Sequence, residues 1–164
     1  MSFPSEILLS QNGGPIQGLQ FEPRRVIADD RGAVIHHLRG DSPLLPSFGE
    51  VYASTIHQGA IKAWKKHLRV AQNLSVPIGA VRVVVHDNRP DSTSSDSTME
   101  FVLNRQNHGI LHIPAGLWYG FQGMGAGESL TLNCVSDIHD PAESVRLPED
   151  SGEIPYHWSN LPPI

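Results

Sequence analysis

The chain has 164 residues, enough for one domain with a sizeable core, since domains most often contain about 100 to 150 residues. Its formal net charge of -5 argues against nucleic acid or an anionic membrane as a partner, because both require an extended basic surface. No secretory signal pattern and no apolar run near the roughly 18 residues needed to span a bilayer is found, which predicts a cytoplasmic protein. We expect a single domain over 1–164, with a core of about 25–158 between polar, proline-rich ends.

Short windows of apolar alternation and β-branched residues recur along the chain. Gly, Pro, Asp or Ser bounds each window, and the 15 Gly and 13 Pro favour many short elements over long helices. The expected strands lie within residues 26–38, 49–57, 60–76, 79–87, 100–104, 109–114 and 129–136. This spacing predicts an all-β sandwich or small barrel, with a short helical turn starting at Pro141.

The only cysteine, Cys134, lies in the strand-like segment LTLNCVSD, so no internal disulfide is expected. Free cysteine is commonly buried as a small hydrophobe, and we favour that interpretation over a nucleophile.

The segment AIKAWKKHLRV, residues 60–70, is basic in an acidic chain. On a regular strand Lys65 and His67 share one face, whereas Lys62 lies on the other. If the first face points into a barrel, burial would lower the pKa of Lys65 and make it a candidate base or Schiff-base amine. If it points outward, the two side chains form an ordinary solvated face.

The nine histidines do not show the spacing of a metal site. Small barrels often place two ligating histidines two residues apart on one strand. His36 and His37 are adjacent and therefore point to opposite faces, and Lys65, not a histidine, stands two residues before His67. We predict no bound metal.

The segment HGILHIPAGLWYGFQG, residues 108–123, runs as a strand into a turn at Pro114 to Gly116 and continues with three aromatic residues. These aromatics either fill a corner of the core or turn the phenol of Tyr119 into a pocket as a proton donor.

An ordered series of segments resembles the dTDP-4-dehydrorhamnose 3,5-epimerase family. The series is DDRG, IKAW with a following basic pair, SVPIGAVRVVVHDNR, GILHIPAGLWYGF, NCVSDIHDP and IPYHW, and it runs from about Arg25 to Trp158. The resemblance implies a cupin-type double-stranded β-helix (jelly roll), a homodimer, no cofactor, and a nucleotide-linked 4-keto sugar as ligand. Family enzymes invert carbons beside the sugar ketone by removing and returning protons.

The resemblance also implies roles for individual residues. The family's Arg-Gly-Leu-His run falls on residues 62–65, so Lys65 occupies the position of the catalytic histidine and Lys62 that of the arginine. Tyr119 replaces a ligand-contacting histidine, and His139 aligns with the acid tyrosine. We predict Lys65, Tyr119 and His139 as catalytic residues. Lys62 reaches the same ligand as Lys65 only if the strand bulges.

The predicted substrate-binding residues are Arg31, Lys62, His67, Gln72 and Asn133. Arg31 lies within DDRG, where the family uses an arginine to bind substrate. Gln72 aligns with a lysine near the ketone, and Asn133 aligns with a tyrosine. The family's aspartate that orients the catalytic histidine has no clear equivalent after Trp158.

Two functions are compatible with this pattern. The chain is either an epimerase with a rearranged catalytic set, or a non-catalytic protein that binds a sugar nucleotide or a partner enzyme. In the second case the cationic side chains would simply pair with phosphates. A surface basic strand without a small ligand is the plainest alternative.

Overall fold

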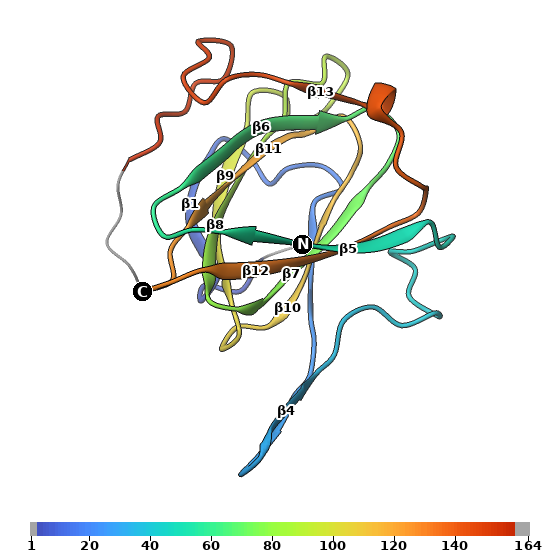
Figure 1. The fold of residues 1–164 in the computed structure, drawn as a ribbon. Helices are drawn as coiled ribbons and strands as arrows, with labels where there is room; N and C mark the ends of the chain where they lie inside the picture. The colour runs from blue at the N-terminus through green and yellow to red at the C-terminus, as the bar shows by residue number, and fades with distance from the viewer. Residues whose placement is uncertain (1–2, 160–164) are drawn as a thin grey trace.

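The computed structural model describes residues 3–159, and within them almost all regular structure is β (Figure 1). The strands are β1 (Leu8–Asn12), β2 (Gln20–Pro23), β3 (Val26–Asp29), β4 (Gly32–Ile35), β5 (Glu50–Ile56), β6 (Ile61–His67), β7 (Gln72–Ile78), β8 (Ala80–His86), β9 (Thr98–Asn104), β10 (Gly109–Ile113), β11 (Trp118–Gly123), β12 (Ser129–Val135) and β13 (Ser144–Arg146). A short 3-10 turn, η1 (Pro141–Glu143), precedes β13. The predicted all-β class is confirmed, as is the helical turn at Pro141.

Two antiparallel sheets face each other (Figure 1). The first has the order β1-β9-β8-β11-β6-β13, and the second has the order β2-β10-β7-β12-β5. Strands that follow one another in sequence mostly alternate between the two sheets, as in a jelly roll. The predicted cupin-type double-stranded β-helix is therefore confirmed.

The main core lies between the sheets, and a second apolar cluster covers the outer side of the first sheet. Strand β8 separates them: Val83 and Val85 pack into the main core, while Val84 faces the second cluster with Trp64 and Trp118. Burial on both faces explains the nearly continuous apolar run of β8.

The link between β7 and β8 is a single residue, Gly79, with φ of +74°. A side chain there would be strained, and its Cβ would approach the Cα of Ser129 to 2.8 Å. Glycine thus allows the chain to cross from one sheet to the other at this point.

Strands β3 and β4 form a separate two-stranded hairpin that projects away from the barrel (Figure 1). Ile27 and Val34 on this hairpin are 55% and 61% exposed. No sheet of the described residues covers these apolar side chains.

The sheets begin nearer the N-terminus than the predicted core of about 25–158. Strand β1 pairs with β9, and β2 pairs with β10. The predicted segment 60–76 is two strands, because the chain turns at 68–71 and passes from one sheet to the other. Cys134 is free and buried, as expected. Residues 3–159 contain no helix long and apolar enough to cross a membrane.

Candidate active site

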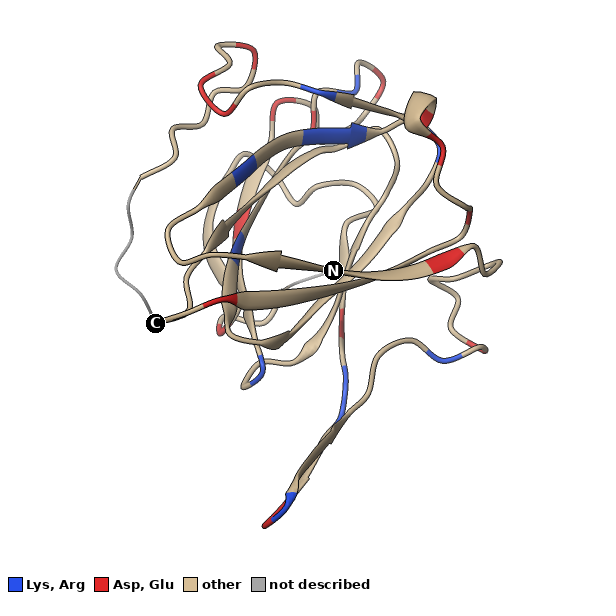
Figure 2. Cartoon of the chain, in the orientation of Figure 1, with Lys and Arg blue, Asp and Glu red and all other residues tan. Residues whose placement is uncertain are grey.

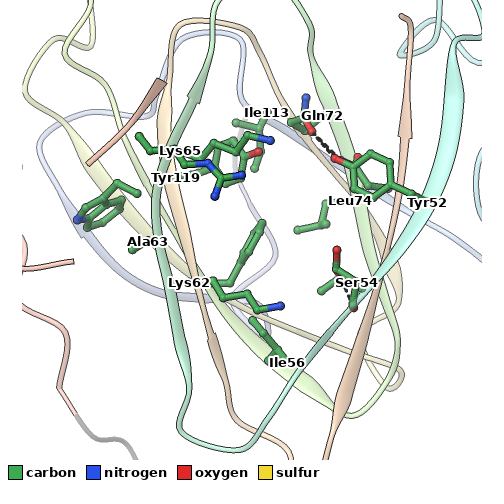
Figure 3. A pocket seen from close by; sticks show the side chains of 15 residues that line it. Tyr52, Ser54, Ile56, Lys62, Ala63, Lys65, Gln72, Leu74, Ile113 and Tyr119 are labelled. Atoms are coloured by element: carbon green, nitrogen blue, oxygen red, sulfur yellow. Dashed lines mark hydrogen bonds between the residues drawn. The ribbon is translucent and has the colours of Figure 1, made fainter. Parts of the chain in front are cut away.

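A cavity of about 490 Å³ opens between the sheets. One wall comes from β6, β11 and β13, and the opposite wall from β5, β7 and β12 (Figure 3). Its polar lining consists of Tyr52, Ser54, Lys62, Lys65, Gln72, Tyr119, Thr131, Asn133 and Arg146. The volume is typical of a site for a small organic ligand.

A β-bulge brings Lys62 into the cavity. Lys65 pairs with Tyr119, but the register then shifts so that Lys62 pairs with Phe121. Two residues of β6, Ala63 and Trp64, therefore face a single residue of β11. Lys62 and Lys65 consequently line the same cavity, as the bulge hypothesis requires.

The cavity is cationic. Lys62, Lys65 and Arg146 line it, and no Asp or Glu is among its described lining residues. Figure 2 shows basic residues along β6, whereas most acidic residues lie in loops. Burial and the neighbouring Arg146 lower the pKa of Lys65, and Glu143 opposes them only in part. The site therefore suits an anion and holds a lysine that is easier to deprotonate than usual.

Tyr52 and Gln72 are hydrogen-bonded on the opposite wall (Figure 3), and Asn133 contacts both. Asn133 Nδ2 donates to Gln72 Oε1 at 2.6 Å and to the Tyr52 hydroxyl at 2.7 Å. The Tyr52 hydroxyl donates to Gln72 Oε1 at 3.3 Å. Burial raises the pKa of Tyr52 more than the Asn133 hydrogen bond lowers it, so the phenol stays protonated at neutral pH.

Tyr119 stands beside Lys65 on the first wall. Only 5% of the residue is exposed, and burial raises the pKa of its phenol well above the ordinary value. Its ring lies parallel to that of His67, with 6.0 Å between the ring centroids. Tyr119 therefore packs in the core and also lines the cavity, while its role as a proton donor stays a prediction.

His67 contacts Glu143 instead of the main cavity. His67 Nδ1 is hydrogen-bonded to Glu143 Oε2, while the other oxygen of Glu143 accepts from the backbone N–H groups of Arg69 and Val70, both at 2.9 Å. Burial alone would raise the pKa of Glu143, but these donors outweigh it and hold the pKa below its ordinary value. The ionised carboxylate therefore fixes the imidazole with its Nδ1 as donor.

Five of the predicted site residues line the main cavity, namely Lys62, Lys65, Gln72, Tyr119 and Asn133. His67 lies behind them with Glu143. His139 is exposed and lines a smaller adjoining pocket, not this cavity, and its catalytic role stays a prediction. Arg31 lies at the tip of the projecting hairpin, where it pairs with Asp29 and its side chain is 85% exposed.

Sequence reasoning missed Tyr52, Glu143 and Arg146. Tyr52 is half-buried on β5 between exposed neighbours, but one of them is the apolar Val51, so apolar alternation in the sequence does not mark Tyr52 as inward. Glu143 and Arg146 reach the site because β13 pairs with β6. No sequence signal indicated that pairing.

Within residues 3–159 no three His, Cys, Asp or Glu side chains lie close enough together to hold a metal ion. The groups that the cavity does offer are cations, amides and phenols. They can bind an anion and transfer protons.

Fold and cavity together define a class: a cupin-type jelly roll whose interior can bind an anionic ligand and transfer protons. The chain is 38% identical to a dTDP sugar isomerase from Desulfovibrio desulfuricans G20, with a TM-score of 0.85 over 87% of this chain and 92% of that one. It is also 29% identical, over 88% of this chain and 95% of the relative, to the probable low-salt glycan biosynthesis epimerase Agl13 of Haloferax volcanii. The chain belongs to the dTDP-4-dehydrorhamnose 3,5-epimerase family of sugar isomerases.

A dTDP-4-dehydrorhamnose 3,5-epimerase from Bacillus anthracis, solved with TDP and PPi bound, shares the fold. Its TM-score is 0.75 at 19% identity, over 94% of each chain. No protein-family model matches the chain.

Proposed function

We propose that the chain is an epimerase for a nucleotide-linked 4-keto-6-deoxy sugar. The observation that carries this proposal is a single cavity with a lysine of lowered pKa on one wall and a protonated phenol on the wall opposite. A ketone acidifies the neighbouring C–H, and inversion needs a base on one face of that carbon and an acid on the other.

Lys65 acts as the base in this proposal. Tyr119, its neighbour across the strand pair, donates a hydrogen bond to the ketone oxygen and stabilises the enolate. Tyr52, on the facing wall, returns the proton. Lys62 and Arg146 pair with the diphosphate. Gln72 and Asn133 hold Tyr52 in place and contact the sugar.

Proton NMR in D₂O with dTDP-4-keto-6-deoxyglucose tests the reaction. We expect deuterium at one or both carbons beside the ketone. Lys65→Ala should abolish this exchange and leave nucleotide affinity within a few-fold. Lys66→Ala is the matched control, because Lys66 lies over the Trp118 ring, 4.6 Å from its centroid, and does not line the cavity. Exchange that survives Lys65→Ala excludes Lys65 as the base.

A non-catalytic nucleotide-sugar-binding protein is the second candidate. Its supporting observation is the surplus of positive charge, since phosphate pairing needs no change in pKa. Nucleotide binding without deuterium exchange in the same experiment would favour the non-catalytic protein, or would indicate that the substrate carries a different sugar.

We further propose a cytoplasmic homodimer. The β3–β4 hairpin carries exposed Ile27 and Val34 away from the barrel, a surface that a second copy would cover. Arg31 at its tip would then contribute to substrate binding in the partner. Light scattering should give twice the monomer mass, and Arg31→Ala should weaken nucleotide binding without changing that mass.

A further inference from the structure

A second chamber of about 30 Å³ adjoins the main cavity. Tyr52, Lys65 and Gln72 line both, so these three residues separate the two spaces. His67 and Glu143 line only the smaller one. A polar chamber of this size has room for about one water molecule.

The imidazole of His67 is oriented toward accepting a proton. Its Nδ1 is committed to Glu143, and its Nε2 is buried with no hydrogen-bond partner among the described residues. In this tautomer Nε2 carries the lone pair. A buried acceptor without a partner is costly, which favours a role for it.

The outer part of the small chamber is acidic and open to solvent. Asp137 and Asp140 line it with side chains 46% and 41% exposed, and both pair with Arg69. Exposed His139 and half-buried Glu50 complete that end. A proton that reaches the chamber therefore has groups nearby that can pass it to bulk water.

We infer that His67, held by Glu143, relays the proton taken up by Lys65 to solvent. The inference rests on the proposed function. Each inversion by a two-sided mechanism leaves Lys65 protonated and the facing Tyr52 deprotonated, so both must be reset before the next turnover.

The Lys65 ammonium gives one proton to the water in the chamber, and that water gives one of its own protons to His67 Nε2. One N–H bond breaks at Nζ and one forms at Nε2, and the lysine regains its lone pair. The imidazolium, paired with Glu143, then releases the proton to solvent at the acidic end. Arg146 pairs with Lys65 across β13 and β6. Tyr119 stacks on His67 and stays protonated, because burial raises the pKa of its phenol well above the ordinary value.

Turnover at constant pH and ionic strength, measured over a range of buffer concentrations, tests the relay. His67→Gln should lose about tenfold or more in turnover at low buffer and recover as buffer rises, because dissolved base then resets Lys65. His57→Gln is the matched control: this surface histidine pairs with Glu128 at 3.6 Å, with its side chain 83% exposed. Wild type and the control should not respond to buffer.

Full turnover of His67→Gln at low buffer overturns the relay. So does a loss that buffer fails to restore in a variant that still binds nucleotide. If wild type itself gives no turnover, the proposed function fails as well, which separates the two outcomes.

A titration by ¹⁵N NMR tests the same coupling without activity. Burial and the nearby Lys65 lower the pKa of His67, against the opposing Glu143 contact. Lys65→Met should therefore raise the pKa of His67, and Lys66→Met should leave it unchanged. An unchanged His67 pKa in Lys65→Met overturns the relay.

Discussion

Replacing Glu143 by alanine removes the acceptor of three N–H groups at once. The groups are the backbone amides of Arg69 and Val70 and the Nδ1–H of His67. Glu143 is 4% exposed, and a buried donor left unpaired costs about 1 to 3 kcal/mol. The Arg69 amide is only partly buried and can turn to water, so we expect a loss of about 3 to 5 kcal/mol in the free energy of unfolding.

Glu143→Gln should cost much less. Its amide oxygen can still accept from the backbone N–H groups of Arg69 and Val70. Its NH₂ group takes the place of Oε2, so His67 must change tautomer and accept at Nδ1, and the charge on this contact is lost. Charge-assisted hydrogen bonds are about twice as strong as neutral ones, which gives an expected loss of about 1 to 2 kcal/mol. The difference between the two variants therefore measures the two backbone contacts together with the contact to His67 that glutamine can still make.

Urea unfolding at pH 7 measures both losses from the midpoint and slope. As a control, Glu128→Ala removes the carboxylate that pairs with exposed His57 and should lower the free energy of unfolding by at most about 1 kcal/mol. Because the pKa of Glu143 lies below its ordinary value of 4.5, its ionic contribution is present above that pH and is lost as the pH falls through the lower folded value. The difference in free energy of unfolding between wild type and Glu143→Gln should therefore become smaller below that pH. A cost below about 1 kcal/mol for alanine, or equal costs for both variants, would refute the reasoning.

Three further outcomes are expected. Burial lowers the pKa of His37 from 6.5 to about 4, so the free energy of unfolding should fall as the pH drops from 7 toward 4. His37→Asn can keep the hydrogen bond to Ser75 and should make the free energy of unfolding depend less on pH in unfolding titrations. Arg146→Gln removes a charge that lowers the pKa of Lys65, so the ascending, acid-side limb of the exchange rate against pH should move to higher pH; an unmoved limb would exclude this coupling. Lys62→Met should weaken nucleotide binding about tenfold at low salt and less at high salt by calorimetry, and equal loss at both salts would contradict a direct phosphate contact.

The alternation of apolar and polar residues in the sequence predicted the strands that have a face buried in the core. Strand β8 is apolar on both sides because each face meets its own cluster. Strands β1, β2 and β13 are short and mostly exposed or half-buried, so they carry little apolar pattern. Each of these three strands is held by hydrogen bonds to a neighbouring strand that lies far away in the sequence.

The site was predictable to the extent that one strand supplies it. Lys62, Lys65 and His67 are local to β6, and the family resemblance added Tyr119 across the strand pair. Sequence reasoning did not identify Glu143, because a carboxylate two residues after a proline in a polar loop is usually solvated. Only the path of the chain from β12 back to β6 buries it against the imidazole.

The bulge explains why an acidic protein concentrates lysines in one strand. Gly120 lies opposite the bulge, and a Cβ there would come within 2.7 Å of the Cβ of Ala63, so glycine makes room for the extra residue. The extra residue turns Lys62 inward with Lys65, while Trp64 packs outward in the second apolar cluster. Positive charge thus gathers at a cavity between the sheets, with Lys62 and Arg146 exposed and Lys65 half-buried. An acidic exterior and a cationic interior together favour a small anion over a polyanion such as nucleic acid.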